Sequence, residues 1–199
     1  MFKITTVLAA ASMTFLAVVV VRAGQAPADG PRYQGMSLVR PADYREWVFL
    51  SSGLGMEYEA EAKAGPNPRF GNVFVNPASY RSFMQTGRWP DRTIFVLEFR
   101  ASRSEGSINK AGRFQGDLVV LEAEVKDARY PDGWAFFNFS RNGKVLDVAE
   151  PLPESAGCVE CHTKNTAVER TFVQFYPTLM DVARKMGTVK PTYDPNRKP

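Results

Sequence analysis

Five consecutive residues near the C-terminal end of the chain carry the side chains best suited to chemistry. Residues 158–162 read Cys-Val-Glu-Cys-His and contain both cysteines and the only histidine of the 199 residues. A C-x-x-C-H run is typical of c-type haem attachment. The thiols of Cys158 and Cys161 would add to the two vinyl groups on one edge of the porphyrin, and the imidazole of His162 would ligate the iron.

The same cysteines could instead form a disulfide, a redox-active dithiol or part of a zinc site. A thioredoxin-like dithiol would need a strand before it and a helix that starts inside it. Pro151, Pro153 and Gly157 precede this pair and are typical of a loop. A structural zinc ion takes four ligands, and the sequence has no second Cys or His cluster. We therefore favour covalent haem, with one group per chain.

The N-terminus predicts export. A charged start at Lys3 precedes an apolar or small-residue run over 4–21, and small residues follow it. This pattern is typical of a secretory signal peptide, here over residues 1–23. Cleavage after Ala23 or after Ala26 is compatible with the pattern, and a retained membrane anchor is the alternative. We expect a periplasmic protein, because c-type haem is attached outside the cytoplasm in bacteria.

The formal charge of +4 does not indicate a nucleic-acid-binding protein. Removal of residues 1–23 would leave 23 basic and 21 acidic side chains, which are scattered along the chain. The remaining length suits one domain. We expect a haem domain over residues 41–187, preceded by a loop over 24–40 and followed by a disordered tail over 188–199.

Strands dominate the predicted core. Alternating, β-branched and aromatic residues predict strands over residues 70–76, 93–99, 118–125 and 134–139. The Asn142–Gly143 dipeptide predicts a hairpin turn. Short helices are expected over 77–84 and 177–186, each ended by a glycine, with Asn76 as the N-cap of the first. Successive strands followed by a helical segment predict an α+β fold with an antiparallel sheet and short helices.

Taken in order, several stretches of the chain resemble the cytochrome P-460 family, which also includes the cytochromes c'-beta. The resemblance covers about residues 41–186. The matching stretches are Tyr44–Val48, Val73–Tyr80, Gly116–Ala123, Gly133–Phe136, residues 158–162 and Phe175–Pro177. The resemblance implies an antiparallel sheet that clasps one c-type haem, a histidine as proximal ligand, an open distal site and a homodimer.

The resemblance also bears on activity. Family members that oxidise hydroxylamine carry a lysine cross-linked to a meso carbon of the haem. Its position falls in the strand over 93–99 and corresponds here to Leu97, which cannot form that bond. This difference argues against the enzyme activity. Lys110 and Lys126 are the nearest lysines in sequence, and we expect both to be exposed.

The resemblance further aligns Glu122 with a distal carboxylate that moves protons in those enzymes. Alternation would place Glu122 on one strand face with Leu118 and Val120. Burial on a haem face would raise its pKa and make it a possible distal base near neutral pH. The alternative is a carboxylate that faces solvent or pairs with an arginine. Alternation also places Phe95 and Leu97 on one face, as apolar cover for the haem or as ordinary core.

The favoured function is binding of a small neutral ligand, chiefly nitric oxide, at a five-coordinate iron, with redox activity and a periplasmic redox partner. The first alternative is oxidation of hydroxylamine or nitric oxide at the haem, with Glu122 as proton acceptor. The second is simple electron transfer. That function would need a sixth iron ligand from methionine or lysine, because the sequence has no second histidine.

Overall fold

The computed structural model describes residues 29–56 and 65–196. The predicted signal peptide and both candidate cleavage points lie outside these residues. Among the helices of the described residues, none is long and apolar enough to cross a membrane.

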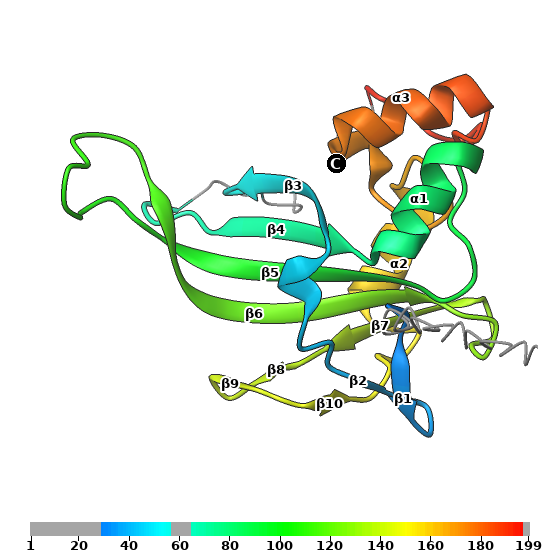
Figure 1. Ribbon diagram of the computed structural model, residues 1–199, viewed down its shortest axis with the longest axis horizontal. Coiled ribbons are helices and arrows are strands. Elements are labelled where there is room, and N and C mark those ends of the chain that lie inside the picture. The colour runs from blue at the N-terminus through cyan, green and yellow to red at the C-terminus, as the bar shows by residue number, and fades with distance from the viewer. Residues whose placement is uncertain (1–28, 57–64, 197–199) are drawn as a thin grey trace, which may run out of the picture.

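A five-stranded antiparallel sheet forms the centre of the molecule (Figure 1). Its strands lie side by side in the order in which they occur in the sequence. They are β3 (Val48–Leu54), β4 (Phe70–Val75), β5 (Thr93–Arg103), β6 (Phe114–Lys126) and β7 (Trp134–Asn138). Antiparallel neighbours of this kind can be joined by short connections. The sheet and the short helices around it confirm the predicted α+β fold.

The two central strands are longer than the sequence predicts. β5 continues past residue 99 and β6 begins before residue 118, so the pair forms a hairpin arm that projects from the sheet (Figure 1). The added residues are mostly polar and include Gly116. Backbone pairing satisfies their N–H and C=O groups, whatever their hydropathy.

A second sheet has three strands, and two of them lie in the predicted loop over 24–40. The loop prediction is therefore wrong for the described residues of that range. The strands of this sheet are β1 (Arg32–Gln34), β2 (Ser37–Val39) and β10 (Val148–Ala149). Gly35 at the β1–β2 turn has φ +62°, which glycine adopts without strain. Leu38 is completely buried in the core. Tertiary packing therefore stabilises these strands, although glycines and prolines interrupt the alternation of apolar and polar residues in the segment.

The predicted hairpin turn at Asn142–Gly143 is confirmed. It joins β8 (Ser140–Arg141) to β9 (Lys144–Val145). The two turn residues have φ values of 52° and 73°. Positive φ at both central positions is what a type I′ hairpin turn requires, and Asn-Gly supplies it at low cost.

Three short helices accompany the sheet. They are α1 (Pro77–Thr86), α2 (Gly157–Lys164) and α3 (Pro177–Met186), with single 3-10 turns at η1 (Tyr44–Glu46) and η2 (Val173–Phe175). Gly87 and Gly187 end α1 and α3 in the left-handed conformation, as predicted. Asn76 is the N-cap residue of α1, as predicted, but its side chain makes no capping hydrogen bond and instead accepts one from the Ile94 N–H at 3.0 Å. Asp29 instead accepts a bond from the first turn of α1, at 2.8 Å.

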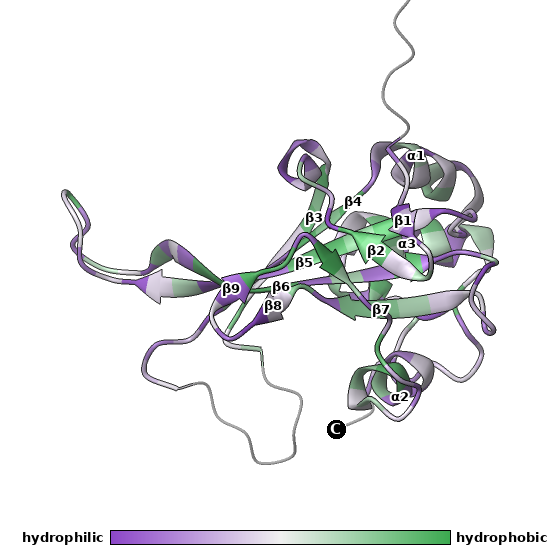
Figure 2. Ribbon diagram, turned by 90° about the horizontal axis from the view of Figure 1, so that it is seen from below, coloured by the Kyte–Doolittle hydropathy of each residue, from purple (hydrophilic) through white to green (hydrophobic). Residues whose placement is uncertain are grey.

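Hydrophobic clusters cover both faces of the sheet. Alternation along β5 directs Ile94 and Val96 to one cluster and Phe95 to the other. The first cluster includes Leu38, Tyr44, Trp47, Phe74, Phe137 and Phe139. The second packs α1 and α3 against the sheet through Phe83, Trp89, Leu179 and Met180. In Figure 2 the apolar residues accordingly gather in the central strands, while the far end of the β5–β6 arm is largely hydrophilic.

The predicted disordered tail over 188–199 is wrong for residues 188–196. Thr188 is buried, and Val189 and Tyr193 pack against the second hydrophobic cluster. The N–H of Lys190 donates to the carbonyl of Ala167 at 2.8 Å. These contacts stabilise a proline-containing segment that has no helix or strand of its own.

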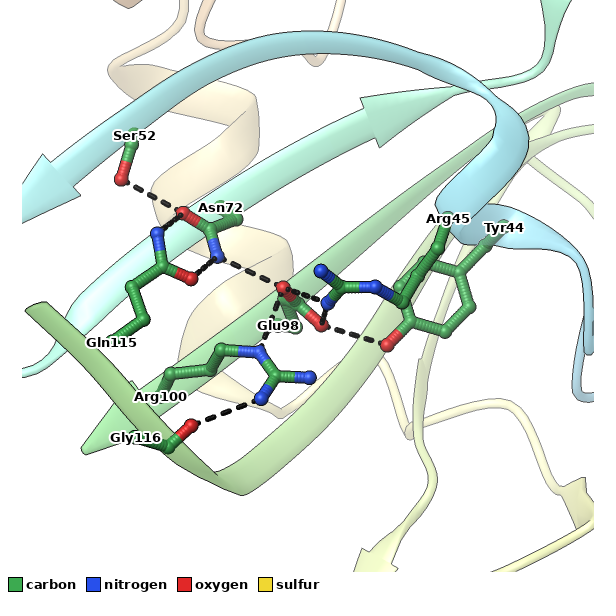
Figure 3. Close-up of polar contacts among 8 residues, drawn as sticks. All are labelled: Tyr44, Arg45, Ser52, Asn72, Glu98, Arg100, Gln115 and Gly116. Carbon is green, nitrogen blue, oxygen red and sulfur yellow. Dashed lines mark hydrogen bonds and ion pairs between the residues drawn. The ribbon is translucent and has the colours of Figure 1, made fainter.

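A buried carboxylate links the strands on the face of the sheet that carries the first cluster (Figure 3). Glu98 of β5 is completely buried. Its oxygens accept hydrogen bonds from Tyr44 (2.7 Å), Arg45 (2.8 and 2.9 Å), Asn72 (2.8 Å) and Arg100 (3.0 Å). Because these donors come from η1, β4 and β5, the carboxylate connects three elements at one point.

The partners of Glu98 keep it ionised. Burial alone would raise the pKa of Glu98, but hydrogen bonds from Arg100, Tyr44 and Asn72 outweigh burial and hold the pKa below its ordinary value. With a depressed folded-state pKa, the group stabilises the fold above the ordinary glutamate pKa of about 4.3. That contribution is lost as the pH falls through the lower, folded-state pKa.

We predict that Glu98→Gln lowers the free energy of unfolding by about 3 kcal/mol at pH 7, because it removes the buried charge that Arg45 and Arg100 bond and leaves both guanidinium groups without a charged acceptor. The matched control, Asp117→Asn, breaks the exposed ion pair with Arg103 and should cost less than about 1 kcal/mol. Urea unfolding at pH 7 measures both changes. As the pH falls through the folded-state pKa of Glu98, the difference in free energy of unfolding between the wild type and Glu98→Gln should disappear. Equal losses for the two variants at pH 7 would contradict the structural role of the network.

Candidate haem site

A cavity of about 530 Å³ lies between one face of the five-stranded sheet and the segment that contains α2 and η2. This volume is within the range of small-molecule and cofactor sites. The wall is mainly apolar and aromatic. Among the residues that the sheet contributes are Gly53, Gly71, Val73, Leu97, Glu122 and Phe136.

The two cysteines and the histidine line this cavity together, from α2. Cys158 and Cys161 are three positions apart, a spacing that places side chains on one helical face. Both thiols are free and partly exposed. The helix begins directly before the first cysteine, and the residues over 152–156 form a turn instead of the strand that a thioredoxin-like dithiol would need.

The ring of His162 is held on several sides. Its Nδ1 hydrogen-bonds the carbonyl of Arg170 at 2.8 Å. Phe136 and Phe172 make edge contacts with the ring, at centroid distances of 4.7 and 4.6 Å. Since Nδ1 is engaged, Nε2 is the nitrogen that remains for a metal.

Electrostatics at His162 favour positive charge. Burial lowers the pKa of the imidazole, but Glu124 and the Arg170 carbonyl outweigh burial and raise it above its ordinary value. The nearest oxygen of Glu124 lies 3.4 Å from Nδ1. A cation at this position is therefore compensated by a carboxylate.

Glycines keep the other end of the cavity open. α2 lies beside β7 in both ribbon views (Figures 1 and 2), so β3 and β4 form the distant part of the wall. Gly53 and Gly71 are direct cross-strand partners there. A Cβ atom on Gly71 would meet the ring of Phe99 at 3.2 Å, and one on Gly53 would collide with Met56. Side chains at these positions would fill the space.

The residues present fit a haem. The cavity offers a thiol pair on one helical face, an imidazole whose outer nitrogen is already bonded, and a broad apolar wall kept open by glycines. Thiolate and imidazole are the attachment and axial groups of c-type haem. Among the described residues, no group of three or more His, Cys, Asp or Glu side chains could hold a bare metal ion.

Glu122 lies on the cavity wall. The prediction that Leu118 shares its strand face is wrong. Leu118 instead packs against the first cluster, because the ladder between β5 and β6 shifts register between Phe99 and Arg100. Burial raises the pKa of Glu122, and His162 partly offsets the rise.

Leu97 and Phe95 both line the cavity. Leu97 pairs with Glu122 across the β5–β6 ladder, so the candidate cross-link position lies directly beside the candidate base. Lys110 is exposed, as predicted. The same prediction is wrong for Lys126, whose ammonium donates to the carbonyl of Trp89 and to Glu169, each at 2.7 Å. Neither lysine is among the residues that line the cavity.

Several residues of the site are not among those predicted from the sequence. Glu124 is two positions after Glu122 on the same strand, so the alternation that selected one carboxylate could have selected both. No sequence pattern distinguishes Phe136 and Phe172 as site residues, because an aromatic residue on a strand or loop more often packs in the hydrophobic core than lines a cofactor site. Among the described residues, Met56 is the one methionine that lines the cavity, and so the one thioether there that could ligate an iron.

Comparison with known proteins agrees with this geometry. Residues 41–173 match the family model of cytochrome P460. No curated protein matches the chain. The matched segment contains η1, the whole five-stranded sheet and α2 with its C-x-x-C-H motif. Members of this family are haem proteins that can bind small ligands, so haem is the cofactor the family implies for the cavity. The chain belongs to the cytochrome P460 family.

Proposed function

We propose that this chain is an exported monohaem c-type cytochrome. Its haem would be attached through Cys158 and Cys161, with His162 as the iron ligand. The observation that carries this proposal is that both thiols and the imidazole line a single apolar cavity. The predicted signal peptide supports a periplasmic location, and the family resemblance supports a homodimer and a periplasmic redox partner.

The cavity favours binding of a small neutral ligand, chiefly nitric oxide. When bound, haem would supply an iron centre that binds such molecules and changes oxidation state. The protein itself would hold the imidazole through its Nδ1 atom, which bonds the Arg170 carbonyl. The aromatic wall would exclude water, and the glycines at positions 53 and 71 would leave space for the group. Among the described residues of that wall, His162 is the one strong nitrogen ligand, which supports an iron with an open sixth position.

Two other functions remain alternatives, each resting on one residue. Oxidation of hydroxylamine or nitric oxide would use Glu122 as proton acceptor, supported by its partly buried position on the cavity wall and its raised pKa. Leu97 argues against it, since it cannot form the lysine cross-link of the enzymes. Electron transfer alone would need a sixth ligand, and Met56 is the methionine on the cavity wall.

We predict that the holoprotein exported by a host with c-type cytochrome maturation keeps its haem through acid–acetone extraction. Cys158→Ser with Cys161→Ser should release it, because no thioether bond remains. The pyridine haemochrome spectrum of the extracted protein measures retention. Full retention of haem by the double variant would contradict covalent attachment at this pair.

We predict a high-spin, five-coordinate spectrum for the ferrous holoprotein, and a new spectrum on addition of nitric oxide. Glu122→Gln should leave nitric oxide binding in place, because a neutral diatomic ligand needs no base. Absorption spectra of both proteins, oxidised and reduced, provide the check. A low-spin ferrous spectrum that Met56→Leu converts to high spin would favour electron transfer. A strongly red-shifted ferrous Soret band, with hydroxylamine turnover that Glu122→Gln abolishes, would favour the enzyme.

A further inference from the structure

Glu124 is a buried carboxylate for which neither the fold nor ligand binding supplies a role. It is 9% exposed and lies on β6. Its cross-strand neighbours are Phe95 and Phe136, and both of them line the cavity. Its Oε1 atom is buried and makes no hydrogen bond with any described residue. A buried carboxylate oxygen without a donor costs free energy, so this position needs an explanation.

The Oε1 atom of Glu124 is directed at His162. It lies 3.4 Å from Nδ1, within ion-pair distance but too long for a well-formed hydrogen bond. The Arg170 carbonyl lies closer to the same nitrogen, at 2.8 Å. Nδ1 therefore has two acceptors beside it, one neutral and one acidic. Burial raises the pKa of Glu124 above its ordinary value. His162 and Arg170 favour its ionised form, and Glu169 opposes it.

Both acceptors are fixed by the surrounding structure. Glu124 is part of a strand paired on both sides. The Arg170 carbonyl follows Glu169, whose backbone has φ +49° and whose carboxylate is bonded by Lys126 at 2.7 Å. The Arg170 guanidinium also pairs with Asp132 at 2.9 Å. A rigid supporting shell of this kind is what holds a ligand ring in one orientation.

We propose that Glu124 is a positioning residue for the iron ligand His162, acting with the Arg170 carbonyl on Nδ1. This inference rests on the proposed function. An acceptor on the outer nitrogen fixes the ring orientation and raises the basicity of the ligating nitrogen. A carboxylate does so more strongly than a carbonyl, because it carries charge. Stronger donation from the imidazole stabilises ferric over ferrous iron, so Glu124 lowers the reduction potential of the site.

The other nearby carboxylates do not have this geometry. Glu122 accepts a hydrogen bond from Asn138 at 3.3 Å. Glu160 is two residues before His162 on α2, but its carboxylate is 67% exposed and is paired with Lys164. Glu160 therefore provides a matched control, since its conversion to glutamine removes the same charge from the neighbourhood without touching the imidazole.

The test compares Glu124→Gln with Glu160→Gln in the holoprotein. Resonance Raman spectroscopy of the ferrous state gives the iron–histidine stretching frequency, and redox titration gives the midpoint potential. Glu124→Gln should lower the frequency and favour the ferrous state roughly tenfold, the order of effect of outer-shell partners, or about 59 mV for one electron. Glu160→Gln should leave the frequency unchanged and shift the potential much less. Equal effects of the two variants on both measurements would overturn the inference.

Glu124→Asp is measured alongside, because it keeps the carboxylate but shortens the side chain by one methylene and so moves the charge away from Nδ1. It should shift the frequency in the same direction as Glu124→Gln, by less. If Glu124→Gln yields no holoprotein, Glu124→Asp alone decides, and an unchanged frequency would overturn the inference. A wild-type holoprotein without an iron–histidine band would overturn the proposed function as well. Normal histidine ligation with no effect at Glu124 would overturn this inference alone.

Discussion

The antiparallel pairing of β5 with β6 is the constraint on which the rest of the structure depends. Because successive residues of a strand point to opposite faces, this ladder sends Glu98 to one side of the sheet and Leu97 with Glu122 to the other. One side becomes a closed core, and the other becomes the wall of the cavity. A shift of register by one residue would exchange the two sets and remove both the core and the site.

The buried carboxylates on the two faces of the sheet differ in their hydrogen bonding. Glu98 has a donor for each of its oxygens and holds η1 and neighbouring strands together. Glu124 has an oxygen with no donor beside the candidate iron ligand. A satisfied buried carboxylate contributes to a unique fold, whereas an unsatisfied one costs stability. Such a cost is typical of functional sites, where local strain or desolvation is retained because it serves the chemistry.

The chemistry and its support come from different parts of the chain. The C-x-x-C-H motif lies on one short helix with no buried residue of its own. The groups that hold the His162 ring come from elsewhere in the chain and include the Arg170 carbonyl, Phe136 of β7 and Phe172 before η2. This division means that residues far from the motif in the sequence, such as Leu97, form the surroundings in which the motif lies.

The sequence by itself determined the C-x-x-C-H motif, the fold class, four of the five strands of the central sheet and the helix ends at Gly87 and Gly187. These features are local, because they depend on residue type, short-range spacing or backbone conformation. Only the tertiary structure decided that residues 37–39 pair with β10, that residues 188–196 pack against the core, and that Glu124 lies beside His162. Each of these depends on contacts between residues far apart in the chain, and such contacts leave no periodic pattern in the sequence.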